Sequence, residues 1–461
     1  MIENFIKWIL KAFQGWREEE NVIFDICVSN AMQNAIYRWS LMYHGNPVWI
    51  DESVKSMNIP SVLASELARL VTIEMESKLE GSPRADFINS FYQRLITRIR
   101  PMVEMACAKG GICFKPYVTN GKLEIDCVQA DCFLPIAYDS DGEICSAAFV
   151  SRITRNSRFY TRVERHCYMD DVYEIRNAVY MSESESDIGK KISFELVPEW
   201  SELSEVTTIK NLDKPLFSYL KMPFANTVDP YSPLGVSCFS RAVDLIEQAD
   251  KQYSRLLWEF EGGELAVDAS IDALKYDKNH PNGKLPKGKE RLFRGLDIDC
   301  GDKDLYEVFS PELRDNSIIN GLNEILIRIE DACGFARGTI SNIDSTSAKT
   351  ATEIKTSKQR TYALVCDTQK ALKHSLTNLI DAINELCDLY NLIPAGEINV
   401  SFEFDDSVVT DRELEFKEKQ QLVMAGIMQP WEFRAWYFGE SEEEAKEKVM
   451  QDDLFGNGSE K

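Results

Sequence analysis

Few side chains in this sequence have the types and spacing that catalysis uses. Two acidic pairs, Asp170-Asp171 and Asp405-Asp406, could bind a metal ion, although adjacent carboxylates at a turn are more often simply solvated. The four histidines are far apart, and the sequence has no phosphate-binding glycine loop, no nucleophile elbow and no paired-histidine zinc motif. We therefore expect no enzyme, no cofactor and no metal site. A cytosolic metal-dependent enzyme that uses Asp405 and Asp406 stays open as an alternative.

Charged residues also alternate along residues 160–166, which read as a strand. They are Arg162, Glu164, Arg165 and His166. Such alternation is typical of cross-strand ion pairs, and we prefer this interpretation to a catalytic one.

The composition is that of an acidic globular protein. The net charge is −23, which argues against a protein that coats nucleic acid with a basic groove. It agrees with a protein that lets nucleic acid pass without holding it. The 12 cysteines form no CxxC pair, which favours reduced, buried thiols. Residues 1–16 are amphipathic without the continuous apolar run of a signal peptide. We expect a helix that packs on a partner or on the chain itself, and a membrane-surface helix is the alternative.

The elements are organised around a helix, an insert and a second helix. Apolar residues at steps of three and four predict a helix over 232–262, from Ser232-Pro233 to Gly262-Gly263. If either glycine needs a positive φ, alanine there would be strained. A second helix is predicted over 310–334, from Ser310-Pro311 to Gly334. The insert, 263–309, combines turn residues, short β-type runs and a basic middle that suits an acidic protein surface better than bases. A buried helical hairpin with a surface excursion is an equal alternative.

The rest of the chain predicts an α+β domain followed by helices. Helices are expected over 22–43, 60–80 and 85–108, the last interrupted at Pro101. Antiparallel strands follow, paired across turns such as Asn120-Gly121; their ranges are 112–118, 123–128, 133–138, 144–153, 159–168, 172–181 and 192–197. A polar loop, 335–348, has few apolar anchors, so we expect its middle to be free. Beyond it we expect a long helix to 391, a strand over 398–404, helices over 411–425, 430–437 and 442–450, and a disordered tail from 451.

This order of parts resembles the bacteriophage portal proteins of long-tailed phages of Gram-positive bacteria. The closest local likenesses are residues 347–354, which read Ser-Ala-Lys-Thr-Ala-Thr-Glu-Ile, and then 402–407 with Asp411, and 426–428. The resemblance implies a mainly helical, multi-domain α+β portal fold. Its parts would be an antiparallel β wing (1–232), a helical stem (232–262 and 310–334), a clip (263–309), a tunnel loop (335–349), a long helix with the helical crown (350–450) and a tail (451–461).

The resemblance also implies a function. Portal proteins form dodecameric rings at one capsid vertex, and double-stranded DNA is packaged and ejected through the central channel. The implied partners are further copies of the chain, DNA, the terminase large subunit, the major capsid and scaffold proteins and a head–tail adaptor, without a membrane or catalysis. The protein would lie in the virion, and in the host cytoplasm during assembly. Another virion or adaptor protein with a similar helical hairpin is the alternative.

Site residues follow from the same resemblance. The tunnel loop would meet DNA through Arg337, Asn342, Ser345, Ser347 and Lys349. The clip would dock the motor or adaptor through Lys284, Lys287, Lys289 and Arg291. The stem would face the lumen or a neighbouring subunit through Asp244, Glu247, Lys251, Glu324 and Arg328, and Glu330 is a further acid expected to face off the stem stripe. A solvated helix face is as frequent for any one of these.

Overall fold

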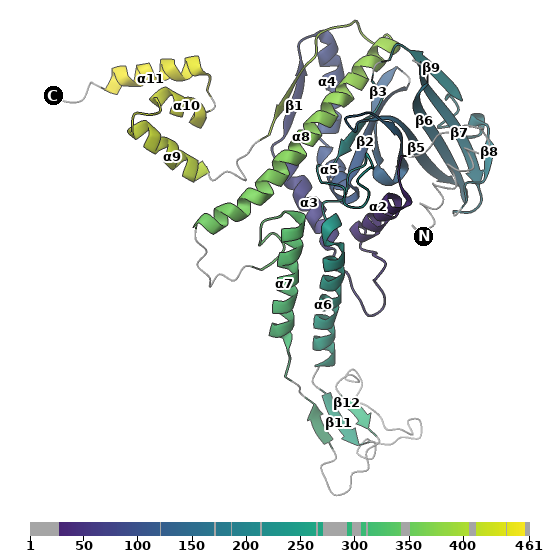
Figure 1. Cartoon of the computed structure of the whole chain (residues 1–461), viewed down its shortest axis with the longest axis vertical. Coiled ribbons are helices and arrows are strands. Elements are labelled where there is room, and N and C mark those ends of the chain that lie inside the picture. Colours follow the sequence, from purple (N-terminus) through teal and green to yellow (C-terminus); the bar gives the residue numbers. More distant parts are fainter. Residues whose placement is uncertain are drawn as a thin grey trace, which may run out of the picture. The chain divides into compact units, whose positions relative to one another are not determined.

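A computed structural model describes most of the chain. The described residues are 27–119, 121–169, 172–185, 187–212, 214–263, 266–270, 293–296, 306–309, 312–342, 351–404, 412–438 and 440–456. The chain divides into two compact units, one of residues 1–72 with 77–402 and one of residues 73–76 with 403–461. Both contain the expected element types, and the fold is the mixed α+β fold that the sequence predicts (Figure 1). The amphipathic pattern at residues 1–16 lies outside the described residues.

Four helices open the first unit: α2 (Asn30–Tyr43), α3 (Ile59–Thr72), α4 (Pro83–Ile96) and α5 (Ile99–Lys109). The hydroxyls of Ser29 and Ser82 cap α2 and α4 by accepting bonds from backbone N–H groups three residues on. The predicted helix over 85–108 is two helices, and Pro101 lies in the first turn of α5, where its missing N–H costs no helical hydrogen bond. The expected kink is therefore a helix start.

The predicted helix over 60–80 is wrong in its second half. Residues 76–80 form strand β1 (Glu76–Glu80), which pairs with β14 (Asn399–Glu403). Alternate residues of β1, Ser77 and Leu79, are buried. A strand partner more than 300 residues away decides this element, and local sequence does not reveal it.

The strands form the predicted antiparallel meander. A three-stranded sheet has the order β10-β2-β3, from β2 (Gly111–Thr119), β3 (Lys122–Gln129) and β10 (Ser218–Lys221). A larger sheet has the order β4-β5-β6-β7-β8, with β9 also paired to β7; its strands are β4 (Phe133–Tyr138), β5 (Ile144–Arg155), β6 (Arg158–Met169), β7 (Val172–Ser182), β8 (Lys190–Ile192) and β9 (Val206–Lys210). The strand expected over 192–197 is wrong beyond Ile192, because residues 194–196 make a 3-10 turn that returns Val197 and Trp200 onto Val179.

Two helices, α6 (Val243–Gly262) and α7 (Asp315–Cys333), pack against each other and form what we call the stem hairpin (Figure 1). The helix start predicted at Ser232 is wrong, because α6 begins eleven residues later. Residues 232–239 instead run through the core in a non-helical path. Cys238 N–H donates to the carbonyl of Cys107 over 2.9 Å, and a Cβ on Gly235 would lie 2.2 Å from the carbonyl oxygen of Gly110. This backbone contact is tertiary and overrides the serine–proline start signal.

The other ends of the hairpin follow the sequence more closely. The start expected at Ser310-Pro311 lies outside the described residues, and α7 begins at Asp315. Gly334 ends α7 with φ +82, as expected. At the end of α6, Gly263 has φ −88, and Gly262 is not left-handed either, so neither glycine meets the condition of a positive φ.

Between the stem helices the insert contains a small sheet with the order β12-β11-β13. Its strands are β11 (Ala266–Ser270), β12 (Phe293–Leu296) and β13 (Tyr306–Phe309). Strands β11 and β12 are parallel and β11 and β13 antiparallel. The short β-type runs of the sequence are confirmed, and most of the basic middle lies outside the described residues.

The long helix α8 (Ala351–Leu389) and strand β14 match their predicted ranges. The second unit has helices α9 (Arg412–Met424), α10 (Pro430–Phe438) and α11 (Glu442–Gly456), held by edge-to-face contacts of Phe416 with Phe433 and Tyr437, both at 5.3 Å. Helix α11 continues to Gly456, so the tail predicted to be disordered from 451 is wrong over its first six residues. None of the helices in the described part of the chain combines the length and apolarity needed to cross a bilayer.

Candidate functional site

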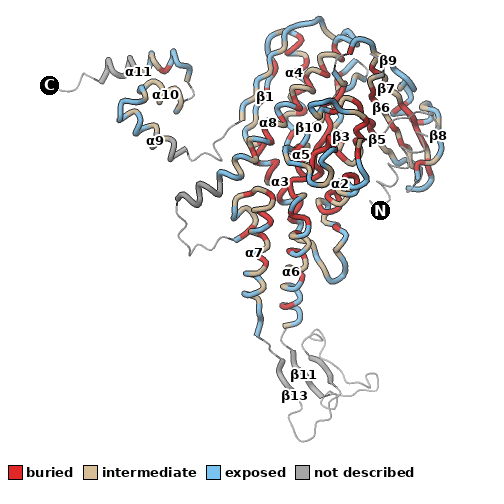
Figure 2. The backbone as a smooth tube through the Cα atoms, in the orientation of Figure 1, coloured by how far each residue is buried: buried red, intermediate tan, exposed pale blue. Residues whose placement is uncertain are grey.

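The stem hairpin is apolar inside and is closed at its far end by an ion pair. Its buried apolar residues are Val243, Ile246 and Ala249 on α6 and Leu322, Leu326 and Ile329 on α7. Figure 2 shows buried stretches along the backbone of both helices. Near the insert, the Glu259 carboxylate accepts bonds from the backbone N–H of Arg314 (3.0 Å) and from its guanidinium (2.8 and 3.2 Å). These bonds lower the pKa of Glu259 and tie the last turn of α6 to the start of α7.

A buried acid anchors the first half of α6. Asp250 is 1% exposed and accepts bonds from Trp49 Nε1 (2.9 Å) and Met57 N–H (2.8 Å), both in the loop between α2 and α3. One turn on, the Ser254 hydroxyl accepts the N–H of Lys55 over 2.8 Å. Burial raises the pKa of Asp250. The loop and the stem helix are therefore joined by a carboxylate that no arginine or lysine neutralises in the described residues.

The segment after α7, residues 335–342, is ordered around one buried carboxylate; we call it the loop root. Glu330 is 0% exposed, and its oxygens accept bonds from the N–H groups of Gly338 (3.1 and 3.2 Å), Ile340 (2.6 Å) and Ser341 (2.8 Å), and from the Ser341 hydroxyl (2.7 Å). The Phe335 side chain is fully buried. The sequence predicts a loop that is fixed at its ends and free in its middle. The structure fixes the first end as predicted, and the bonded part extends as far as Asn342. Backbone N–H groups replace water around a buried charge here.

Two further contacts complete the loop root. Asn323 on α7 holds Asn342 through both of that residue's backbone groups, accepting its N–H over 2.7 Å and donating to its carbonyl over 3.0 Å. On the opposite side, the N–H of Ala336 donates to the Thr361 hydroxyl of α8 over 2.7 Å. The described loop is thus bonded to both long helices that flank it.

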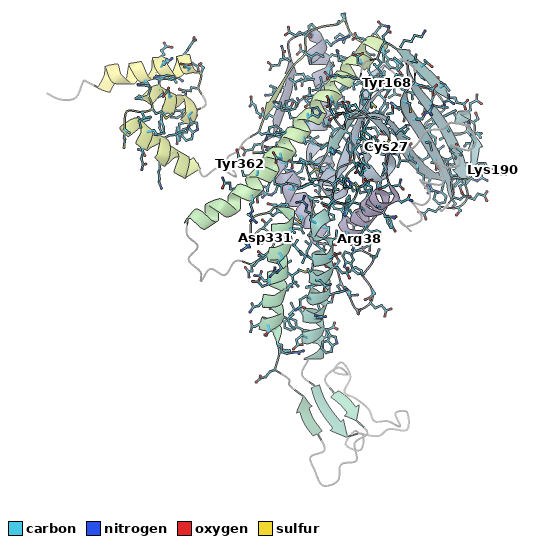
Figure 3. All side chains as sticks on the ribbon, in the orientation of Figure 1. Cys27, Arg38, Tyr168, Lys190, Asp331 and Tyr362 are labelled. Carbon is cyan, nitrogen blue, oxygen red and sulfur yellow. The ribbon has the colours of Figure 1, made fainter. Side chains whose placement is uncertain are left out.

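Arginines gather beside the loop root. Asp331, labelled in Figure 3, accepts bonds from Arg337 (2.8 and 3.3 Å) and from Arg360 of α8 (3.1 Å). The bonds from Arg337, together with the charges of Arg337, Arg360 and Arg328, lower the pKa of Asp331. The side chains of Arg337 and Arg360 remain 56% and 61% exposed. Glu324 and Glu330 also act on Arg337, so three arginines and three acids lie close together beside the loop root.

The predicted stem charges lie on exposed or half-buried positions. Glu247 and Lys251 pair with each other along α6 at 2.5 Å, an ordinary helix-surface pair. The side chain of Asp244 is 94% exposed and lies 3.7 Å from Arg38, and Glu324 and Arg328 are exposed on α7. Their role toward a lumen or a neighbouring subunit stays a prediction.

The structure brings only part of the predicted site together. Arg337 and Asn342 lie in the loop root, but Ser345, Ser347 and Lys349 lie outside the described residues. So do the clip residues Lys284, Lys287, Lys289 and Arg291, and the acidic pairs Asp170-Asp171 and Asp405-Asp406. Sequence reasoning missed Asn323, Asp331 and Arg360. It took Glu330 for an acid that faces off the apolar stripe toward the lumen or a neighbouring subunit, which is wrong because the side chain is fully buried. The sequence does contain a signal that Glu330 is buried. It follows Leu322 and Leu326 at the same spacing of four residues and therefore lies on the apolar stripe of α7.

The charged strand residues make a structural network, as the ion-pair interpretation predicts. One oxygen of the Glu164 carboxylate forms ion pairs with Lys115 of the neighbouring sheet and with Arg162 (2.7 Å). The Nε2 atom of His166 lies 2.9 Å from the other oxygen. Arg165 pairs with Glu174 of β7 at 2.6 Å. Burial alone would raise the pKa of Glu164, but Lys115 and Arg162 outweigh it and hold the pKa well below its ordinary value. Across the described ranges, no three histidine, cysteine or acidic side chains gather as metal ligands.

Comparisons with known proteins cover most of the chain. The model of a family described as phage portal protein, SPP1 Gp6-like, matches residues 60–452. No curated protein matches the sequence. Among solved structures, a chain from the neck of a native GTA particle computed with C12 symmetry aligns with a TM-score of 0.40 and 11% identity, over 86% of this chain and 92% of that chain.

Proposed function

The chain belongs to the SPP1 Gp6-like family of phage portal proteins, and we propose that twelve copies form the ring through which double-stranded DNA enters and leaves the capsid. Portal proteins are structural proteins of the virion neck. The observation that carries the proposal is the order of elements within the matched residues, in which the stem hairpin and its insert lead directly into the loop root and α8. We infer that the chain itself hydrolyses nothing.

The charge of the chain supports a conduit rather than a DNA clamp. A ring lined with many lysines and arginines would bind phosphates tightly, and its affinity would fall steeply with salt. At −23 per chain, the average surface repels DNA instead. We propose that Asp244, Glu247, Lys251, Glu324 and Arg328 contribute to the lumen or to contacts between subunits. The remaining loop positions, Asn342, Ser345, Ser347 and Lys349, would meet DNA together with Arg337.

The ring is tested by native mass spectrometry and negative-stain microscopy of the purified full-length chain. We expect a closed ring with an axial hole at least as wide as a DNA duplex. A chain that stays monomeric at every concentration, or one that forms rings without a hole, would contradict the proposal. A host cell in which the gene is deleted should assemble heads that remain empty of DNA.

We further propose that the clip docks the terminase large subunit during packaging, and the head–tail adaptor afterwards. The major capsid and scaffold proteins would surround the ring in the host cytoplasm during assembly. The support is the basic middle of the insert within an acidic chain.

Reversing Lys284, Lys287 and Lys289 to glutamate should weaken capture of the motor or adaptor while rings still form. Three exposed lysines of the strands give a charge-matched control, in the variant K122E/K190E/K210E. Equal capture by the clip variant and the parent would argue against docking there.

A further inference from the structure

A cavity of about 710 Å³ opens in the first unit between α8, the turn that joins β4 to β5, and the chain on both sides of β10. Its volume lies within the range of pockets that bind ligands. Tyr168 of β6, labelled in Figure 3, is part of its lining. Apolar side chains make up most of the rest, among them Ile144, Phe217, Tyr219, Met222 and Phe224. The lining therefore suits an apolar occupant.

The charged groups at the rim of the cavity are of both signs. They are Asp139, Glu143, Lys214, Lys221 and His374. The Nε2 atom of His374 lies 3.1 Å from the Glu143 carboxylate, and Lys214 pairs with Asp381 of α8 at 2.5 Å. Because acids and bases largely offset each other here, apolar contact rather than charge has to select the occupant.

The described chain begins close to this cavity, at Cys27. The N–H of Cys27 donates to the carbonyl of Pro135 over 3.0 Å, and its thiol donates to the carbonyl of Ile136 over 2.8 Å. Strand β4 leads from Ile136 to the rim in three residues, which is about 10 Å. An exposed aromatic side chain, Tyr138, lies on this stretch of β4 and is 43% exposed.

A second exposed ring extends this apolar surface toward the cavity. The hydroxyl of Tyr138 donates to the carbonyl of Tyr231 over 3.3 Å, and Tyr231 is 87% exposed. Pro233, two residues further on, lines the cavity. Exposed apolar side chains therefore lie between the point where the described chain begins and the cavity.

We propose that the apolar face of residues 1–16 packs over Tyr138 and Tyr231 and into this cavity of the same chain. At a helical period that face carries Ile2, Phe5, Ile6, Ile9 and Phe13. The ten residues 17–26 join it to Cys27 and can span up to about 33 Å, well beyond the distance to the rim. An amphipathic helix laid into an apolar groove is a recurring mode of recognition. The contact lies within one chain and does not depend on the proposed ring.

The experiment measures how fast a maleimide alkylates Cys145, a half-buried thiol in the lining of the cavity, in the purified full-length chain. Deletion of residues 2–16 should speed this reaction about tenfold, because a cavity that is occupied about 90% of the time reacts only in the remaining fraction. Cys366 of α8 is also half-buried but lies outside the lining, so its rate should not change.

Two double variants of the full-length chain test which face of the segment makes the contact. The variant I6D/I9D places charges on the apolar face, so it should expose Cys145 as the deletion does. The variant K7D/K11D makes the same number of changes on the polar face and should keep the parent rate. A synthetic peptide of residues 1–16, added to the deletion variant, should restore the shielding of Cys145, which a damaged fold would not allow.

Filling the cavity tests where the peptide binds. In the deletion variant, Ala225→Trp places a large ring at an exposed position of the lining, and fluorescence anisotropy should show the labelled peptide binding about tenfold weaker or less. The matched control Ala395→Trp changes an exposed alanine outside the lining and should leave the affinity unchanged. Equal affinities in the two tryptophan variants would overturn the assignment to this cavity.

The alkylation rates also separate this occupant from others. Equal rates at Cys145 in the parent and in the deletion variant would overturn the proposal. Shielding that is lost on dilution to monomers would assign the cavity to residues 1–16 of a second copy. Shielding that appears only when another protein is added would assign the cavity to that partner. Either of these results would overturn the contact within one chain.

Discussion

Two acidic side chains lie on the apolar stripes of the stem helices, and each accepts bonds from the backbone of a neighbouring loop. Asp250 follows Ile246 by four residues, and Glu330 follows Leu326 by four. A buried carboxylate normally needs a cation, but N–H groups stabilise its charge as well. Each acid thereby becomes a connection between a long helix and a loop. An acid in phase with a helical apolar stripe is the sequence signal for such a connection.

The two glycines at the end of α6 differ at the residue scale, although they are adjacent. A Cβ on Gly262 would meet only the ring of Trp258, at 3.7 Å, whereas a Cβ on Gly263 would lie 2.3 Å from Leu313 Cδ2 and 2.9 Å from the carbonyl oxygen of Glu259. We expect Gly262→Ala to stabilise the chain by up to about 1 kcal/mol. Gly263→Ala should destabilise it by roughly 1–3 kcal/mol, because the carbonyl cannot move without disturbing the helix end. Thermal melting of the matched pair checks this, and equal shifts in the same direction would refute it.

The buried network around Glu164 predicts a large cost for a small change. In Glu164→Gln the charge of Lys115 stays buried without its partner, which should cost about 3–5 kcal/mol at pH 7. The folded pKa of Glu164 lies below its unfolded value, so its stabilisation is fully present above pH ~4.5 and is lost as the pH falls through the folded pKa. The advantage of the parent over the variant should therefore shrink below that pH. Urea denaturation at pH 7 and at more acidic pH measures both effects.

An exposed pair supplies the control for this prediction. Arg155 and Glu199 lie 2.5 Å apart, and about half of each side chain is exposed. Glu199→Gln should cost less than ~1 kcal/mol, because water screens the pair. Similar losses in Glu164→Gln and Glu199→Gln would contradict the assignment of the network as a buried structural core.

At the scale of elements, the loop root should open when its carboxylate is altered. Glu330→Gln replaces one accepting oxygen by an N–H donor. With the donor in place of Oε2, the bonds that this oxygen accepts from the N–H of Gly338 and the hydroxyl of Ser341 are lost, at a cost of about 1–3 kcal/mol. Trypsin cleaves after arginine, and Arg337 precedes Gly338. Cleavage there should accelerate roughly tenfold for each 1.4 kcal/mol by which opening becomes easier. Glu324→Gln changes an exposed acid of the same helix and is expected to leave the rate unchanged. If both variants were cleaved at the rate of the parent, Glu330 would not hold the loop.

The elements that sequence predicted well are those whose signals are local. The long helix α8, the Gly334 end of α7 and the strand pairs of the meander follow from periodicity and turn residues alone. Strand β1 and the non-helical residues 232–239 were missed because remote partners decide them: β14 for the strand and the Gly110 backbone for the segment. In the same way, the sequence predicts Arg337 as a site residue from its place in the loop. It does not predict Arg360, because the bond to Asp331 that brings Arg360 close to Arg337 is a tertiary contact.

At the scale of the whole molecule, the net charge is strongly negative, whereas the charge at the loop root is nearly balanced. The chain carries −23, which keeps a duplex away from most of its surface. Arg337 and Arg360 at the loop root are exposed, and the nearby acids Asp331, Glu324 and Glu330 offset their charge. If the chain forms the proposed conduit, neither the net charge nor the balanced loop root would hold a passing duplex tightly. This distribution of charge also predicts that moderate salt, which screens it, changes DNA passage less than it changes DNA binding.

The bonds that anchor Asn342 determine which residues of the tunnel loop can be removed when the role of that loop is tested. Both backbone groups of Asn342 are bonded to Asn323, so a deletion that removes Asn342 would also disturb the stem. Replacing residues 343–347 with a shorter glycine–serine link keeps the loop root intact. Ring assembly and melting temperature should then stay near those of the parent, because every described residue of the loop root is retained. Packaging or retention of DNA in assembled heads should fall, since the part of the loop beyond the root could no longer reach the duplex. Heads that fill and hold a complete genome with the shortened loop would show that it only connects α7 to α8.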